Sequence, residues 1–133
     1  MRKEGYGLEG SVLRGTDLPS VMALAYLGDA VFELYVREAL VRRGLSKSKD
    51  LNAAALTYVA APKQAMIAER LQPLLTEEET DVYRRAGNHH LKRPHGATGA
   101  EYRAATGLEA VLGMLHFLGR ADRIRTLLSA GIE

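Results

Sequence analysis

The chain has 133 residues, 47% hydrophobic and 26% charged, with a formal net charge of only +2. This composition is typical of a soluble globular chain, and we expect a single domain over residues 1–133, with 1–17 as a loosely ordered N-terminal segment. An uncharged apolar run of about 18 residues, which a membrane span needs, is absent, and residues 1–17 lack the apolar core of a secretory signal. The absence of cysteine excludes disulfides and thiolate metal sites and suits a reducing compartment, so a cytoplasmic protein is expected.

The elements expected along the chain are all helices. Alanine and leucine dominate, β-branched residues do not cluster, and the alternation typical of strands is missing. Thr76 with Glu79, and Thr98 with Glu101, have the spacing of a capping box, which marks the start of a helix. The sequence therefore predicts an all-α fold of about six to seven helices, with helices over about 19–44, 49–60, 62–74, 76–86, 98–119 and 121–130.

Two acidic residues stand alone in apolar stretches. Asp29 is the only charged residue in 21–32 (VMALAYLGDAVF), and Glu109 is the only one in 104–118 (AATGLEAVLGMLHFL). A buried carboxylate without a compensating partner costs several kcal/mol, and neither acid has a basic neighbour within one helical turn in its own stretch. We expect both side chains to be buried, and to meet if the two helices pack together.

The pair of acids allows two interpretations. Two carboxylates and water suit Mg²⁺, which prefers oxygen ligands and promotes phosphodiester hydrolysis. Alternatively, both acids are structural and are held by backbone donors or by Arg37 or Arg103. Glu33 lies one turn after Asp29 and is either an outer ligand or an ion-pair partner of Arg37.

A basic segment separates the fourth and fifth predicted helices. Residues 87–97 read GNHHLKRPHGA and follow Arg84 and Arg85. Glycine and proline end the helix here, and the basic side chains make the segment either a solvated connector or a loop that contacts phosphates. The histidines match no zinc-binding spacing.

Three segments resemble one known family. Residues 24–40, LAYLGDAVFELYVREAL, resemble the signature helix of ribonuclease III, whose core is Leu-Gly-Asp after an aromatic residue. Residues 102–119, YRAATGLEAVLGMLHFLG, are similar to its second catalytic helix, and 59–65, VAAPKQA, look like the start of another family helix. The resemblance covers about 18–130 and leaves no room for a double-stranded-RNA-binding domain. With the pattern around 102–110, the chain looks most like the Mini-ribonuclease III branch.

The resemblance implies the fold of a ribonuclease III catalytic domain and assigns catalytic, metal-binding roles to Asp29 and Glu109. Ala25 and Thr106 stand where the larger ribonuclease III enzymes have two further acids. The implied cofactor is therefore Mg²⁺, with Mn²⁺ as a substitute, and one ion held well by two protein carboxylates. The implied activity is hydrolysis of double-stranded RNA to 5′-phosphates, with the large ribosomal RNA precursor as substrate.

Cutting both strands of a duplex needs two sites. The resemblance implies a twofold homodimer, which would provide one site in each chain. The interface is expected on the first helix, where Tyr26, Val31, Phe32 and Tyr35 are available. The side chains expected to contact RNA are basic and lie at or near the 87–97 segment or at a helix start: Lys63, Arg84, Arg85, His89, Lys92 and Arg93.

Two other functions fit the same residues. The main alternative is a non-catalytic homodimer of the same fold that binds RNA or the ribosome. It is plausible because Ala25 and Thr106 replace two acids of the larger enzymes. A helical dimerisation module with purely structural acids is the third.

Overall fold

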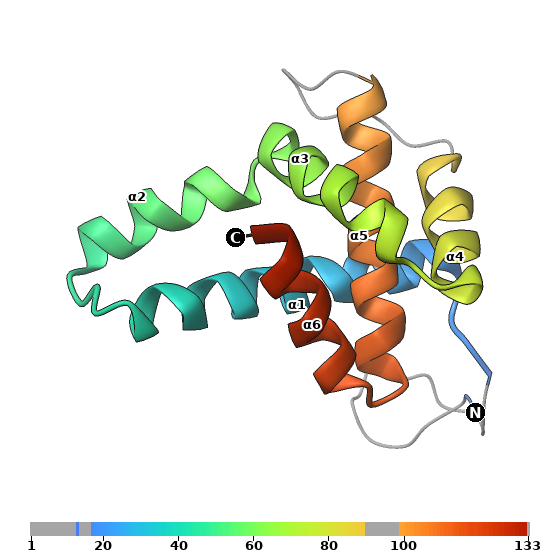
Figure 1. Cartoon of the computed structure of the whole chain (residues 1–133), viewed down its shortest axis with the longest axis horizontal. Coiled ribbons are helices and arrows are strands. Elements are labelled where there is room, and N and C mark those ends of the chain that lie inside the picture. The colour runs from blue at the N-terminus through green and yellow to red at the C-terminus, as the bar shows by residue number, and fades with distance from the viewer. Residues whose placement is uncertain (1–12, 14–16, 90–98, 133) are drawn as a thin grey trace, which may run out of the picture.

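The computed structural model describes residues 13, 17–89 and 99–132. Within these ranges the chain is helical, as predicted, with six α-helices and one short 3₁₀-helix (Figure 1). The elements are α1 (Val21–Arg42), α2 (Ser48–Val59), α3 (Ala61–Leu71), η1 (Gln72–Leu74), α4 (Glu77–Gly87), α5 (Gly99–Phe117) and α6 (Ala121–Ile132). Among the described helices, none is long and apolar enough to cross a membrane.

The predicted helix ends agree with the structure to within a few residues, because local signals set them. Ser20 caps α1 by accepting a hydrogen bond from the backbone of Ala23. Thr76 and Glu79 form the predicted capping box at the start of α4. The second predicted box includes Thr98, which lies outside the described residues.

Helix α5 forms the centre of the fold. It packs against α1, α3, α4 and α6, and α1 runs across it (Figure 1). From Ala105 to Leu115 every side chain except that of Glu109 is buried. This burial explains why the sequence of α5 is apolar on every face.

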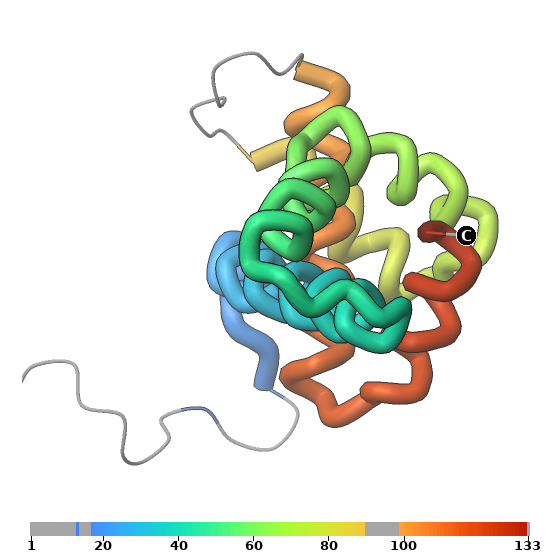
Figure 2. Tube along the Cα trace, turned by 90° about the vertical axis from the view of Figure 1, so that its left-hand side faces the viewer, coloured from blue at the N-terminus to red at the C-terminus, as the bar shows by residue number. Residues whose placement is uncertain are grey.

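Helix α1 buries one apolar face and exposes the other. Leu24, Phe32 and Val36 lie in the core, whereas Tyr26 is 85% and Leu34 61% exposed. Two of the residues predicted for a subunit interface are therefore unavailable, because Val31 and Phe32 pack inside the chain. Helix α2 follows α1 in the chain and folds back beside its C-terminal half (Figure 2).

The α1–α5 crossing depends on two glycines. A Cβ atom on Gly28 would lie 1.6 Å from the carbonyl oxygen of Glu109, and one on Gly113 would lie 1.9 Å from that of Leu24. The two backbones are thus in direct contact, which only glycine permits at these positions.

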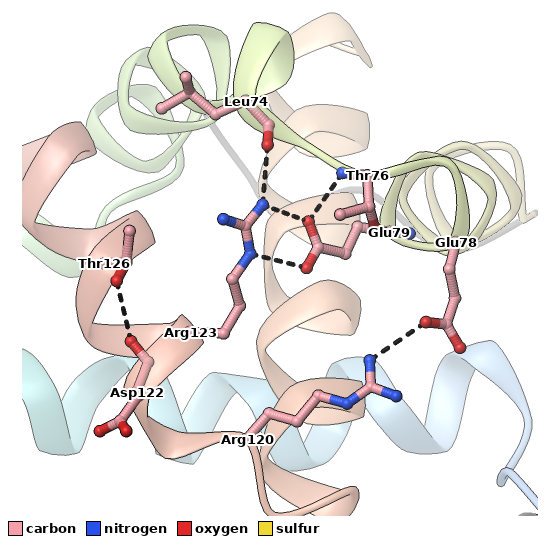
Figure 3. A network of polar contacts seen from close by, with 8 residues as sticks. All are labelled: Leu74, Thr76, Glu78, Glu79, Arg120, Asp122, Arg123 and Thr126. Atoms are coloured by element: carbon pink, nitrogen blue, oxygen red, sulfur yellow. Dashed lines mark hydrogen bonds and ion pairs between the residues drawn. The ribbon is translucent and has the colours of Figure 1, made fainter.

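A polar cluster joins α4 and α6. The Arg123 guanidinium donates two hydrogen bonds to the carboxylate of Glu79, at 2.9 and 2.8 Å, and one to the carbonyl of Leu74 (Figure 3). The backbone N–H of Thr76 donates to the same carboxylate, and Arg120 pairs with Glu78 nearby. Glu79 is only 2% exposed, so these donors replace the water that it loses.

Candidate functional site

The α1–α5 crossing brings the two lone acids together. Asp29 follows Gly28, and Gly28 lies against the backbone of Glu109. The two carboxyl groups come within hydrogen-bonding reach, so that a protonated Glu109 donates to Asp29. The predicted convergence of Asp29 and Glu109 is thus present, and the close backbone contact is its cause.

The prediction that both acids are buried is wrong for Asp29. Its side chain is exposed, whereas that of Glu109 is partly buried. The reason is geometric: Leu24, Gly28 and Phe32 face the core, and Asp29 lies beside this stripe at the rim of the helix. The pair therefore has a recessed member and a member open to solvent.

Electrostatics favour a positive charge between the two acids. Burial, together with the negative charge of Asp29, raises the pKa of Glu109 to about 8 from an ordinary value of 4.5. A hydrogen bond from Gln64 acts in the opposite direction but does not outweigh these effects. Holding both groups ionised is therefore costly until a cation is placed beside them.

Gln64 is a site residue that the sequence analysis missed. It lies on α3, is 3% exposed, and its Nε2 is 3.4 Å from Oε2 of Glu109. A signal was present in the sequence, because Gln64 shares the apolar stripe of Ile67, Ala68 and Leu71 at helical spacing. A polar residue in such a stripe needs a buried partner.

The basic residues considered as structural partners of the acids are engaged or placed elsewhere. Arg37 pairs with Glu33, as one of the two alternatives for Glu33 predicted. Arg103 is exposed and lines a shallow pocket of about 360 Å³ between α4 and the start of α5. Within the described part of the chain, neither arginine forms an ion pair with Asp29 or Glu109.

The donor set fits a hydrated divalent cation. The described residues contain no group of three or more His, Cys, Asp or Glu side chains placed to hold a metal. Asp29 and Glu109 nevertheless offer hard oxygen ligands. Burial and the negative charge of Asp29 raise the pKa of Glu109, and a cation beside the pair would offset both effects. Two carboxylates completed by water suit Mg²⁺, which keeps much of its hydration shell in proteins. Ala25 and Thr106, one helical turn before each acid, are buried and add no charge.

The side chains predicted to contact RNA lie in different surroundings. Arg84 and Arg85 are exposed on α4, and both form ion pairs with Asp81. The N–O distances are 3.7 Å for Arg84 and 2.9 Å for Arg85. His89 is exposed just beyond α4. Two further candidates, Lys92 and Arg93, lie outside the described residues.

Lys63 belongs to another part of the surface. It precedes Gln64 on α3, is partly buried, and its Nζ lies 5.4 Å from the ring centroid of Tyr58. The aromatic ring holds the ammonium group without neutralising it. Lys63 is therefore the neighbour in sequence of Gln64, the residue that contacts Glu109.

Known proteins share this arrangement of helices. The Ribonuclease III domain family matches residues 22–120. A "Mini-ribonuclease 3" of Symbiobacterium thermophilum is 46% identical over 113 residues, which cover 84% of this chain and 87% of that protein. A "Mini-ribonuclease 3" of Streptococcus pneumoniae is 40% identical over 116 residues, which cover 84% of this chain and 90% of that protein.

A solved structure agrees with the sequence matches. The crystal structure of a Fusobacterium nucleatum protein superposes with a TM-score of 0.77 at 32% identity, covering 86% of this chain and 93% of that one. Identity and fold similarity thus extend over most of the chain, including both helices of the acid pair. The chain therefore belongs to the ribonuclease III family of endoribonucleases and, within it, to the Mini-ribonuclease 3 group.

Proposed function

We propose that the chain hydrolyses double-stranded RNA with Mg²⁺ held by Asp29 and Glu109, and that it leaves 5′-phosphates. The observation that carries the proposal is the meeting of two carboxylates at the α1–α5 crossing, in the described structure, without a paired arginine or lysine. The membership of an endoribonuclease family supplies the reaction class.

The two acids have different tasks in this proposal. Glu109 is recessed and anchors the cation, whereas the exposed side chain of Asp29 holds it at the surface where an RNA strand can approach. When bound, Mg²⁺ supplies neutralisation of the scissile phosphate and activation of water, and Mn²⁺ can replace it because both prefer oxygen ligands. Asp29 and Glu109 must be ionised to bind the ion, so binding displaces the proton of Glu109.

A twofold homodimer is proposed to place two such sites on one duplex. The exposed face of α1 carries Ala23, Tyr26, Ala30 and Leu34 at helical spacing, and Asp29 lies at its rim. Exposed apolar side chains that continue along one helix face are typical of an interface. In the dimer this face would be covered by the same face of the partner.

The RNA is proposed to be recognised by its shape and its phosphates, because side chains cannot read the deep major groove of A-form helices. Arg84, Arg85 and His89 are exposed and supply basic contacts, and binding should weaken steeply as salt is raised. The proposed cellular substrate is the large ribosomal RNA precursor, cut in the cytoplasm.

The test is cleavage of a long RNA duplex in Mg²⁺, comparing the wild type with Asp29→Asn and Glu109→Gln. Each variant removes one negative charge from the proposed site with little change in shape, and we expect cleavage to fall by about 1,000-fold. Glu38→Gln is the matched control, because it removes one charge from the exposed surface of α1, where Glu38 pairs with Arg42.

The outcomes separate the functions. Cleavage by the wild type and the control alone, at unchanged helicity, supports the proposal. Binding of the duplex without cleavage by the wild type would favour the non-catalytic alternative. Cleavage by Glu109→Gln at the wild-type rate would contradict the assignment of the site.

The dimer has its own test. Sedimentation equilibrium should give twice the chain mass for the wild type, and Leu34→Glu should yield monomers, because a charge on this face would be buried against its copy. A control at Leu56, which is 68% exposed on α2, should leave the mass unchanged after the same substitution. A monomeric wild type at micromolar concentration would contradict the dimer.

A further inference from the structure

Gln64 is placed where a polar side chain is costly. It is one of three buried polar or charged residues in the described structure, with Glu79 and Thr106. Its neighbours on the inner face of α3 are all apolar: Ile67, Ala68 and Leu71. A leucine or methionine would fill the same space without the cost of removing an amide from water, so the amide calls for an explanation beyond packing.

The partner of Gln64 is the recessed acid of the proposed site. Its Nε2 donates to Oε2 of Glu109 at 3.4 Å, between residues 45 positions apart in sequence. This distance is longer than the usual 2.9 to 3.0 Å, so the bond is weak in the described state. The contact nevertheless links α3 to the recessed acid, because the side chain of Gln64 is buried and its Nε2 faces Oε2 of Glu109.

A glutamine amide suits this place because of what it can and cannot do. Its NH₂ group donates without carrying a charge, so it orders a carboxylate but does not compete with a cation for it. An arginine or lysine there would neutralise Glu109, as Arg123 neutralises Glu79. Oε2 of Glu109 thus has an uncharged donor within the fold, and the same carboxyl group also contacts Asp29.

We propose that Gln64 is a positioning residue, which holds Oε2 of Glu109 so that the carboxylate is oriented toward the cation shared with Asp29. The inference rests on the proposed function. Because the side chain of Gln64 is buried and set in a helix, it restricts the Glu109 rotamers before any ion or RNA arrives.

The test uses binding of Mn²⁺ to RNA-free protein, by calorimetry, and cleavage of an RNA duplex. Gln64→Met keeps the length and burial of the side chain but removes the donor. We expect Mn²⁺ affinity and kcat each to fall about 10-fold, with KM for the duplex unchanged, because partners of metal ligands contribute on this scale. Gln72→Met is the matched control, since Gln72 is exposed in η1 and should leave both quantities unaltered.

A second variant keeps the inference testable if Gln64→Met does not fold. Gln64→Asn keeps the amide but shortens the side chain by one methylene, which withdraws the donor from Oε2 of Glu109, so Mn²⁺ affinity and kcat should again fall about 10-fold. A wild-type Mn²⁺ affinity and kcat in folded Gln64→Met or Gln64→Asn would overturn the inference while the proposed function stands. A wild type that neither binds Mn²⁺ nor cleaves would overturn both.

Discussion

Glu79 and Glu109 both lose contact with water in the folded chain, but their pKa values shift in opposite directions. Burial alone would raise the pKa of Glu79, but hydrogen bonds from Arg123 and Thr76 and the charge of Arg123 lower it. Burial also raises the pKa of Glu109, and here the neighbouring charge is that of Asp29, which raises it further. Among the described residues, Glu79 therefore has a cationic partner, whereas the charged neighbour of Glu109 is another acid.

The difference indicates which acid is structural. Glu79 belongs to a capping box and joins α4 to α6, so its partners stabilise the folded chain (Figure 3). Glu109 lowers the stability of the metal-free chain when it is ionised, and such a cost is typical of functional sites. The two glutamates thus belong to a stabilising cluster in one case and to the proposed cation site in the other.

The largest expected effect is at the stabilising cluster. Arg123→Met leaves Glu79 buried without its cation and should lower the free energy of unfolding by about 3 kcal/mol. The control Arg125→Met breaks the exposed pair with Asp122 and should cost less than about 1 kcal/mol. Urea unfolding measures both, and equal losses would remove the distinction between the two clusters.

A smaller loss, of a different kind, is expected at the acid pair. Gly28→Ala puts a Cβ atom against the carbonyl of Glu109, and we expect a loss of about 2 to 3 kcal/mol as α1 and α5 move apart. Since Asp29 and Glu109 then separate, Mn²⁺ binding should be lost in protein that remains folded at low temperature. Retention of wild-type Mn²⁺ affinity by Gly28→Ala would show that the close contact at Gly28 is not what brings Asp29 and Glu109 together.

The smallest effect is a pH dependence of opposite sign at the two glutamates. The folded-state pKa of Glu109 is about 8, above the ordinary 4.5, so the folded chain holds an extra proton between these values. Its stability without metal should therefore fall as pH rises from about 5 to about 8, by about 1 to 2 kcal/mol, allowing for partial exposure. Glu79, with a lowered pKa, contributes stability that is lost as pH falls below about 4.5.

Glu109→Gln isolates this effect, since an amide does not titrate. Urea midpoints of the metal-free variant should stay level between pH 5 and pH 8, while those of the wild type decline. A parallel decline in both proteins would assign the pH dependence to other groups.

The helices could be predicted because their signals are local. The capping box at Thr76, the prolines and the glycines lie within a few residues of the ends that they set. Asp29 and Glu109 could be found because a lone charge in an apolar run is visible in the sequence. The error about the burial of Asp29 arose because α1 is apolar on two faces, and only tertiary packing decides which face is covered.

The features that could not be predicted depend on contacts between residues that are far apart in the sequence. Arg123 and Glu79 are 44 positions apart, and Gln64 and Glu109 are 45 apart. No local pattern pairs such residues, although the position of Gln64 in an apolar stripe indicates that it needs a partner. The Gly28–Gly113 crossing likewise depends on two helices that only the fold brings together.

The most direct test of the central claim is calorimetric titration of RNA-free protein with Mn²⁺ at pH 7, in buffers of different ionisation enthalpy. If the acid pair is a cation site, the wild type should bind one ion per chain and release nearly one proton, because Glu109 has a pKa of about 8 and must ionise. Glu109→Gln should bind no ion and release no proton. Binding by Glu109→Gln with wild-type affinity would contradict the account.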